Sequence, residues 1–295
     1  MELEWVDTFL AVADAGSFTR AAEALFISQS VVSKHIQKLE QALGTPLFDR
    51  TRRRICLTEA GSRVYPLART LAQQYRRMAR AAAEGSRLRL ALLPVADCYG
   101  LPQLLADFAR SSGLQPLLEE EENAAMPSLL ARGGCDGAFF RVPADEPLPP
   151  GGIPLYRDRL VLVLPAGHPL AGADRPLPLA RFAQTPFLLL NAGTGLLAAS
   201  TALCRRAGFR PQVAYTGASG GNIARMVRSG AGVALLAEGV ARQYRGNGLA
   251  VADVTPTCES LLVFCPAPGF AQTPGIRALT AFLHRRASQA PAELS

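Results

Sequence analysis

Two helical patterns joined by a very short connection constrain the first part of this chain more than any other feature. At 100° per residue, the apolar positions of residues 26–44 fall in one narrow stripe: Val32, Ile36, Leu39 and Leu43. The preceding pattern, "SFTRAAEALFI", is separated from this one by only a few residues around Phe26 to Ser28. Two helices joined so closely must cross sharply, which is the helix-turn-helix arrangement.

The face opposite this apolar stripe carries very little charge. Ser30, Ser33, Lys34, Gln37 and Gln41 lie there, with Gln29 beside them in the first turn. In a helix-turn-helix the second helix enters the major groove with its N-terminal residues toward the bases. Gln suits adenine, Ser suits bases or phosphates, and Lys suits guanine or phosphate. The face therefore indicates DNA contact; a plain three-helix bundle with a polar surface is the alternative.

The boundaries of these helices can also be predicted. An earlier pattern places Trp5, Phe9 and Val12 on one face and ends at Gly16. Ser17 or Thr19 suits the N-cap of the second helix. Ser28 suits the N-cap of the third, which should end at Gly44.

A short hairpin with a basic tip should follow. "TPLFDRTRRRICLTEAG" has apolar positions around a turn that carries Arg50, Arg52, Arg53 and Arg54. Residues 1–60 hold seven Lys and Arg against eight Asp and Glu, so this segment is not basic as a whole. Between residues 28 and 54, however, six cations face only two acids. Such local positive charge is what one DNA-facing surface requires.

The segment from Thr58 to about Gly85 predicts a long helix with a dimerisation seam. Apolar residues recur at a 4-3-4-3-4 spacing: Val64, Ala68, Leu71, Tyr75, Met78 and Ala82. Pairing with a second copy would cover this seam, and packing against the chain's own C-terminal domain is the alternative. Pro66 is expected to bend or weaken the helix near its start.

Residues 9–61 together resemble the N-terminal domain of LysR-type transcriptional regulators, through "SFTRAAEAL", "SQSVVSKHI" and "LGTPLFDR". The later segments "LYRDRLVLVLPAGHPLA" and "MVRSGAGVALLAE" match the family more loosely. The resemblance implies a winged helix-turn-helix domain, dimerisation through the linker helix, often as a dimer of dimers, and a C-terminal domain that senses a small molecule.

The resemblance also implies individual roles. It places Gln29, Ser30, Ser33 and Lys34 on base edges and nearby phosphates, with Ser28 at the start of the same helix. Thr19 would contact phosphate, and Arg50, Arg52 and Arg53 would reach the backbone or the minor groove. Many members have Arg at the position of Lys34. Because Lys lacks the planar fork of Arg, base specificity there is expected to be looser.

Beyond residue 87 the pattern alternates between strands and helices, which favours α/β structure with a mostly parallel sheet. Two α/β lobes are expected, and the arrangement resembles the periplasmic-binding-protein-like effector domain of the LysR-type family. The fold class predicted is an all-α winged helix-turn-helix domain followed by this two-lobed α/β domain. The predicted boundaries are 1–58 for the DNA-binding domain, 59–86 for the linker helix and 87–295 for the effector domain. Its first lobe would span about 87–160 and 268–295, and its second about 161–267.

An effector should lie between the lobes, near strand ends and helix N-termini. The candidate residues are Pro94, Val95, Asn123, Arg141, Ala192, Gly193, Thr194, Ser219 and Gly221. Glycine-rich turns expose N–H groups, so an anion is the favoured ligand class. Val95 stands where the family often has a hydroxyl residue, which leaves open a more apolar effector or none. Glu119 to Glu122 are interpreted as a solvated strand end.

The remaining features narrow the function. The net charge of +7 fits a polyanionic partner. Six scattered cysteines lack metal-site spacing and are interpreted as reduced thiols; only Cys204 lies where peroxide-sensing members carry two, near Gly195. Neither a membrane-spanning run nor a signal peptide is present, so a cytoplasmic protein is expected. We expect no metal, cofactor or catalytic residue.

The expected partners are double-stranded DNA, a small-molecule effector and a second copy in a homodimer or dimer of dimers, with RNA polymerase left open as a further partner. Two other classes of function remain as alternatives: an α/β enzyme with an appended DNA-binding module, and a non-specific DNA-architectural protein. Against an enzyme, the sequence lacks GxSxG, HExxH, P-loop and GxGxxG motifs.

Overall fold

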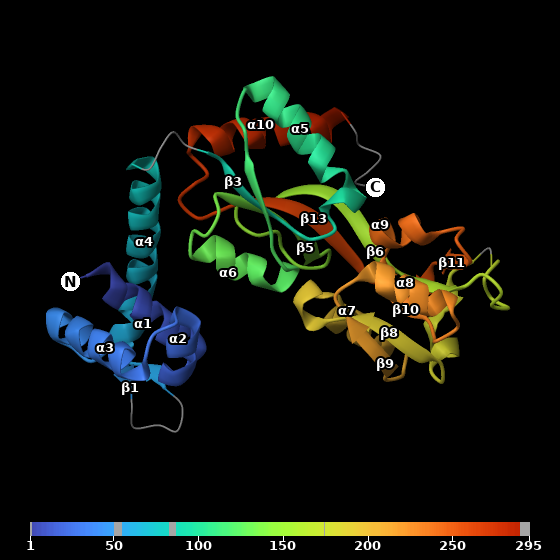
Figure 1. The fold of residues 1–295 in the computed structure, drawn as a ribbon, viewed down its shortest axis with the longest axis horizontal. Helices are drawn as coiled ribbons and strands as arrows, with labels where there is room; N and C mark the ends of the chain where they lie inside the picture. Colours follow the sequence, from blue (N-terminus) through green and yellow to red (C-terminus); the bar gives the residue numbers. More distant parts are fainter. Residues whose placement is uncertain (1, 50–54, 83–86, 174, 290–295) are drawn as a thin grey trace. The chain divides into compact units, whose positions relative to one another are not determined.

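The structure is a computed structural model that describes residues 2–49, 55–82, 87–173 and 175–289. The chain divides into two compact units, the first formed mainly by residues 1–86 and the second by most of the remainder (Figure 1). The first unit has one hydrophobic core and the second has two.

The first unit contains the predicted helix-turn-helix. Its helices are α1 (Leu3–Ala15), α2 (Phe18–Leu25) and α3 (Gln29–Leu43). Ser17, rather than Thr19, caps α2, and Ser28 caps α3; each hydroxyl accepts a backbone N–H. Helices α1 and α3 end at Gly16 and Gly44, whose φ angles of 61° and 69° suit glycine.

The apolar stripe of α3 faces the core of the first unit. Val32, Ile36 and Leu39 are buried. Leu43 was expected in the same stripe but is 42% exposed, because it lies in the last turn, past the end of the core. The core that α3 shares with α1 fixes which side of the helix faces outward.

A two-stranded wing follows, formed by β1 (Phe48–Asp49) and β2 (Cys56–Leu57) as an antiparallel pair. Glu40, near the end of α3, fixes the start of the wing. Its Oε1 atom accepts the N–H of Leu47 at 2.8 Å and of Phe48 at 3.3 Å. The basic tip, residues 50–54, lies outside the described residues.

Helix α4 (Glu59–Ala82) begins directly after the wing and runs through Pro66. A Cβ atom on Gly61 would lie 2.1 Å from the carbonyl oxygen of Leu47, so this close approach requires glycine. Ala68 and Ala72 are buried in the first core, and Val64 packs against it. Of the predicted seam, Ala68 is thus buried in the domain's own core and Val64 is partly buried against it, whereas Leu71, Tyr75 and Met78 are exposed.

The first lobe of the second unit is a sheet covered by helices. Its strands are β3 (Arg89–Leu92), β4 (Leu117–Glu120), β5 (Gly137–Pro143), β6 (Ile153–Pro165) and β13 (Glu259–Pro266). Its helices and short 3-10 turns are η1 (Ala96–Tyr99), α5 (Leu101–Ser112), η2 (Asn123–Ala125), α6 (Met126–Ala131) and α10 (Pro274–Gln289). In Figure 1, α5 and α10 lie side by side on one face and α6 lies on the other.

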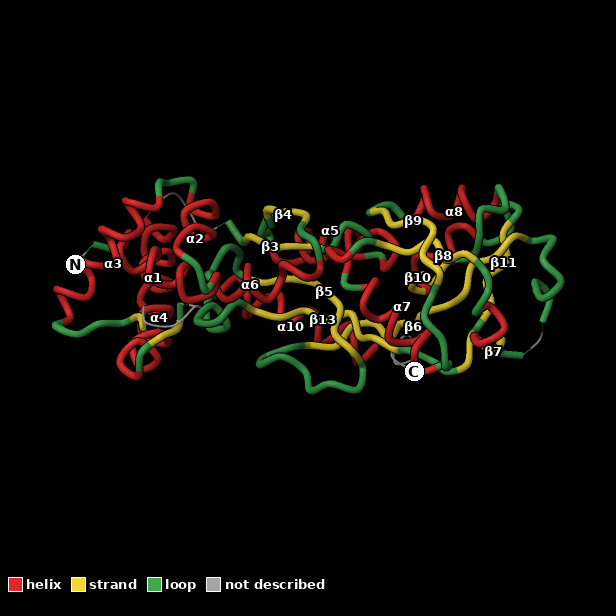
Figure 2. Tube along the Cα trace, turned by 90° about the horizontal axis from the view of Figure 1, so that it is seen from below, coloured by secondary structure: helices red, strands yellow, loops and turns green. Residues whose placement is uncertain are grey.

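The second lobe surrounds its own core. Its strands are β7 (Leu177–Pro178), β8 (Pro186–Leu190), β9 (Gln212–Gly217), β10 (Ala234–Ala237), β11 (Leu249–Ala252) and β12 (Val254–Thr255). Its helical elements are η3 (Leu179–Phe182), η4 (Ala192–Thr194), α7 (Leu196–Arg206), α8 (Gly220–Arg228), α9 (Glu238–Ala241) and η5 (Arg242–Tyr244). Figure 2 shows the helices and strands of both lobes from below, with β3, β5 and β13 in the first lobe and β8, β9 and β10 in the second.

Two expectations about this unit need correction. The sheet is mixed rather than mostly parallel: β3 is parallel to β4 and β5, whereas β13 is antiparallel to both β5 and β6. The chain leaves the first lobe along β6 and returns along β13, so these neighbours must run in opposite directions. The predicted second lobe, 161–267, was also too long, because Leu262 to Cys265 of β13 lie in the first lobe's core.

Candidate functional site

The outward face of α3 presents polar side chains at its first two turns. Gln29, Ser30 and Lys34 are exposed, and Ser33 is half-buried. Ser28 is also exposed; its Oγ accepts the N–H of Val31 and lies 2.8 Å from Oγ of Ser30. The side chains of Gln29, Ser33 and Lys34 make no hydrogen bond or ion pair with any other described residue.

Two further contacts orient α3 against α1. The hydroxyl of Thr8 donates to the carbonyl oxygen of Glu4 at 2.7 Å, so it is left to accept from Nδ1 of His35 at 3.0 Å. On the same helix, the ammonium of Lys38 lies 5.1 Å from the centre of the Trp5 ring. His35 thus has a structural role within the domain.

The other candidates for DNA contact come from separate elements. Thr19 is exposed in the first turn of α2. Arg50, Arg52 and Arg53 lie outside the described residues. Of the residues predicted to contact DNA, the structure therefore describes Thr19 and those on the outward face of α3.

In the second unit, segments from both lobes enclose a cleft with a cavity volume of about 50 Å³. Five of the nine predicted effector residues line it: Pro94, Val95, Asn123, Arg141 and Thr194. The residues that sequence reasoning missed are Leu93, Glu122, Leu190, Leu196, Ala218, Gly220 and Val240. The lining is mostly apolar, and the volume corresponds to roughly one or two water molecules.

Four predicted residues are not part of this lining: Ala192, Gly193, Ser219 and Gly221. Ser219 serves as the N-cap of α8, where its Oγ accepts the N–H of Asn222 at 3.3 Å. Gly193 lies beside Glu122, because a Cβ atom there would lie 3.3 Å from the Glu122 carboxyl carbon. Glu122 therefore lines the cleft. The interpretation of this residue as part of a solvated strand end was wrong.

The polar groups of the cleft are largely engaged within the protein. The Asn123 side chain clamps β5, with Oδ1 accepting the N–H of Arg141 at 2.7 Å and Nδ2 donating to its carbonyl oxygen at 3.2 Å. The Arg141 side chain is buried, and its Nε and Nη2 atoms donate to the hydroxyl of Tyr99 at 3.1 and 2.8 Å. The Arg141 guanidinium also lies over the Tyr99 ring.

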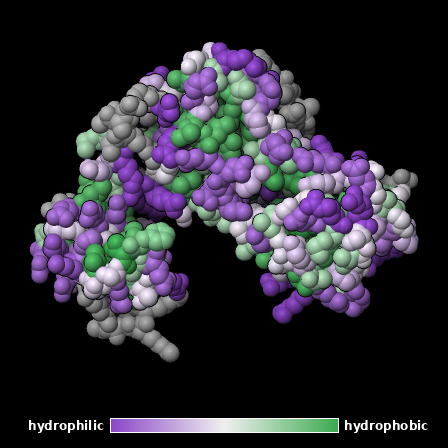
Figure 3. All heavy atoms as spheres, viewed as in Figure 1, coloured by the Kyte–Doolittle hydropathy of each residue, from purple (hydrophilic) through white to green (hydrophobic). Residues whose placement is uncertain are grey.

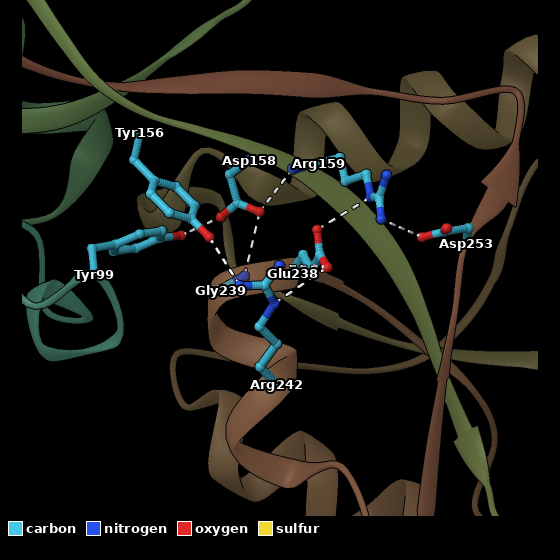
Figure 4. A network of polar contacts seen from close by, with 8 residues as sticks. All are labelled: Tyr99, Tyr156, Asp158, Arg159, Glu238, Gly239, Arg242 and Asp253. Carbon is cyan, nitrogen blue, oxygen red and sulfur yellow. Dashed lines mark hydrogen bonds and ion pairs between the residues drawn. The ribbon is translucent and has the colours of Figure 1, made fainter. Parts of the chain in front are cut away.

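Tyr99, at the end of η1, in turn connects this short turn to β6 and α9 (Figure 4). Its hydroxyl donates to Oδ2 of Asp158 at 2.5 Å, and the other carboxylate oxygen accepts the N–H of Arg159 at 2.7 Å and of Gly239 at 3.3 Å. Asp158 is only 2% exposed. Burial raises the pKa of Tyr99, so the phenol stays protonated and remains a donor.

The surface side of this network is held by ion pairs. Arg159 bridges Glu238 at 3.2 Å and Asp253 at 3.0 Å, and Arg242 pairs with Glu238 at 3.0 Å. Figure 4 shows these groups around the start of α9. Together with Asp158, they join the strand that crosses between the lobes to a helix of the second lobe.

Comparison with known proteins decides the family. Residues 3–62 match the model of the bacterial regulatory helix-turn-helix protein, lysR family, and residues 81–288 match the LysR substrate binding domain. The chain belongs to the LysR family. It is a bacterial regulatory helix-turn-helix protein with the effector-binding domain of that family.

Several regulators are similar in sequence or structure to this LysR-family chain. It is 37% identical over 235 residues to a probable hydrogen peroxide-inducible genes activator of Mycobacterium avium, which covers 77% of this chain and 75% of the relative. It is 36% identical over 196 residues to the HTH-type transcriptional regulator CatR of Pseudomonas putida, covering 65% and 66%. A Corynebacterium glutamicum OxyR C206 mutant structure matches with TM-score 0.57 and 26% identity, covering 99% and 93%.

Cys204 is the one cysteine in α7 of this LysR-family chain, the helix that follows Gly195. Cys204 lies in the second-lobe core, and its burial raises the pKa of the thiol to about 11. Gly195 precedes α7, with φ of 73°. All six cysteines are free. Among the described residues, no group of His, Cys, Asp and Glu could hold a metal ion, and no helix is long and apolar enough to span a membrane.

Proposed function

We propose that this LysR-family protein regulates transcription by reading operator DNA with α3 and by binding a small molecule between the two lobes of its second unit. The observation that carries the proposal is the outward face of α3. On this face Gln29 and Lys34 are exposed and make no bond with any other described residue, while the buried stripe, the Ser28 cap and the Glu40 anchor fix the helix beneath them. A rigid helix with free donors and acceptors is what base reading requires.

Each residue of the DNA-binding set has a role in this proposal. Gln29 reads an adenine edge, Lys34 reaches guanine or phosphate, and Ser30 and Ser33 contact bases or phosphates. Thr19, at the start of α2, contacts phosphate. In the predicted wing, Arg50, Arg52 and Arg53 reach the backbone or minor groove, and Ser28 sets the N-terminus of α3.

Dimerisation is proposed through α4, along the exposed part of the predicted seam and the neighbouring Leu67. Leu67 is 70% exposed, Leu71 42%, Tyr75 46% and Met78 62%, whereas Val64 and Ala68 face the domain's own core. Apolar side chains are visible at the surface of the first unit in Figure 3. A second copy would cover this row, giving a homodimer or a dimer of dimers, and two linked DNA-binding units would read two half-sites.

The effector is proposed to be a small molecule in the cleft lined by Val95, Arg141 and Thr194. The cavity of about 50 Å³ admits only a few heavy atoms, so a larger effector requires the lobes to move apart. An anionic effector stays a prediction: Arg141 supplies a cation, but Glu122 adds a carboxylate to the same lining. We further propose that the protein acts in the cytoplasm, where its DNA is.

Genome-wide mapping of bound sites, followed by competition binding on one site, tests this proposal. The wild type should be displaced by excess specific duplex far more readily than by excess random duplex. Gln29→Ala should lose about 1–3 kcal/mol on the cognate site and relax base preference at one position. Gln272→Ala, which removes an exposed glutamine of the second unit, is the matched control. Equal displacement by both duplexes would show that the protein does not regulate through sequence.

A further inference from the structure

The turn of the helix-turn-helix contains an unexpected residue. Phe26 follows α2 and adopts the left-handed conformation, with φ of 55° and ψ of 39°. It is the one non-glycine residue with positive φ in the part of the chain that the structure describes. A side chain in this conformation is disfavoured, because its Cβ atom crowds the following carbonyl oxygen.

The turn needs this backbone conformation but not an aromatic ring. The N–H of Ile27 donates to the carbonyl oxygen of Ala22 at 3.1 Å, and the N–H of Phe26 to that of Glu23 at 3.2 Å. This is the Schellman pattern, in which glycine or asparagine is the ordinary choice at the left-handed position. Ile27 supplies the accompanying apolar contact by packing against the first core.

The ring of Phe26 contributes almost nothing to the folded domain. Its exposed fraction is 95%, the highest among the exposed large apolar residues. It lies two residues before Ser28 and three before Gln29, both also exposed, at the end of α3 assigned to base contact. Fold stability therefore explains neither the conformation nor the exposure.

We propose that Phe26 is a specificity-determining residue that packs its ring on the 5-methyl group of a thymine in the operator. This inference rests on the proposed function. Phenylalanine is among the side chains that make apolar contact with the thymine methyl group in the major groove. The ring extends the reading surface of α3 with the one kind of contact that Gln29, Ser30 and Lys34 cannot make.

Phe26→Gly and Phe26→Asn test the contact without disturbing the turn, since both residues accept the left-handed conformation. The full chain is titrated onto its mapped operator, and onto copies in which single thymines are replaced by deoxyuridine, by fluorescence anisotropy at fixed salt. Each variant should bind the operator about tenfold more weakly, and the wild type should lose about as much at one deoxyuridine position. Replacing the same thymine by deoxyuridine should not weaken the binding of the variants any further.

Two controls separate this contact from a change in fold or charge. The thermal midpoint of the variants should not fall below that of the wild type, because the left-handed strain is relieved. The slope of log affinity against log salt should stay unchanged, since no phosphate contact is removed. Leu118→Ala, an exposed apolar residue of the second unit, should bind as the wild type does.

The inference is overturned if both Phe26 variants bind the operator as tightly as the wild type does. It is also overturned if every deoxyuridine replacement weakens the binding of the variants as much as it weakens that of the wild type. In that case Gln29→Ala still relaxes base preference, and the proposed function stands. If the wild type does not distinguish operator from random duplex, the proposed function and this inference fall together.

Discussion

The hydroxyl of Tyr99 can be removed with a single substitution, Tyr99→Phe, which keeps the ring in place. The hydroxyl donates to the buried carboxylate of Asp158 and accepts from two nitrogens of the buried Arg141 guanidinium. Without this hydroxyl, the buried Asp158 carboxylate loses one hydrogen-bond donor. The buried Arg141 guanidinium loses the acceptor for two of its N–H groups. Each such loss costs about 1–3 kcal/mol, so we expect the two together to lower the unfolding free energy of the second unit by about 2–6 kcal/mol.

Urea unfolding of the full chain measures this loss. Trp5 is the single tryptophan and lies in the first unit, so its fluorescence reports that unit. Far-UV circular dichroism reports both units. Tyr99→Phe should lower the urea midpoint of the dichroism change assigned to the second unit and leave the fluorescence midpoint of Trp5 where it is in the wild type.

Tyr215→Phe is the matched control. It removes a tyrosine hydroxyl from the same unit that has no hydrogen-bond partner among the described residues. Its cost should stay below about 0.5 kcal/mol. A loss below about 1 kcal/mol for Tyr99→Phe would refute the reasoning, since it would mean that water or a rearranged Arg141 replaces the hydroxyl at no cost.

Three further predictions concern the other parts of the chain. Leu71→Glu should abolish dimers in sedimentation velocity, because it places a charge in the exposed apolar row of α4; Gln74→Glu should not, and a persisting dimer would exclude this seam. Ser28→Ala should cost the first unit about 1 kcal/mol in urea unfolding followed by Trp5 fluorescence, since an N–H of α3 loses its cap; an unchanged midpoint would mean that water replaces the cap. Peroxide should modify exposed Cys56 before Cys204, whose burial raises its pKa to about 11; mass spectrometry that finds Cys204 oxidised first would contradict this.

The DNA-facing part of the chain could be predicted well because its signals are local. Helical periodicity, the cap at Ser28 and the glycine at Gly44 act within a few residues, and each fixed an element where the structure has it. The seam predicted on α4 stays a prediction, since Leu71, Tyr75 and Met78 are exposed but Ala68 is buried in the domain's own core. Only the packing of Ala68 and Ala72 into the first core shows which face remains free.

The effector cleft could be predicted only in part. Strand ends such as Val95 and Asn123 were found, because the ends of parallel strands meet at one edge of a sheet. Leu196 and Val240 were missed, since neither carries a polar group or a motif. Glu122 was misjudged because a run of four glutamates looks solvated in sequence, whereas the fold turns the last one toward Gly193.

The sequence by itself determined the helix-turn-helix, the positions of its caps and the low charge of the recognition face, because these depend on interactions between near neighbours. Only the tertiary structure decided the mixed sheet, the free face of α4 and the Tyr99, Arg141 and Asp158 network. These depend on residues far apart in the chain, such as Tyr99 and Asp158, 59 positions apart, which share a hydrogen bond only in the folded unit. Contacts of that separation leave no periodic trace in a single sequence.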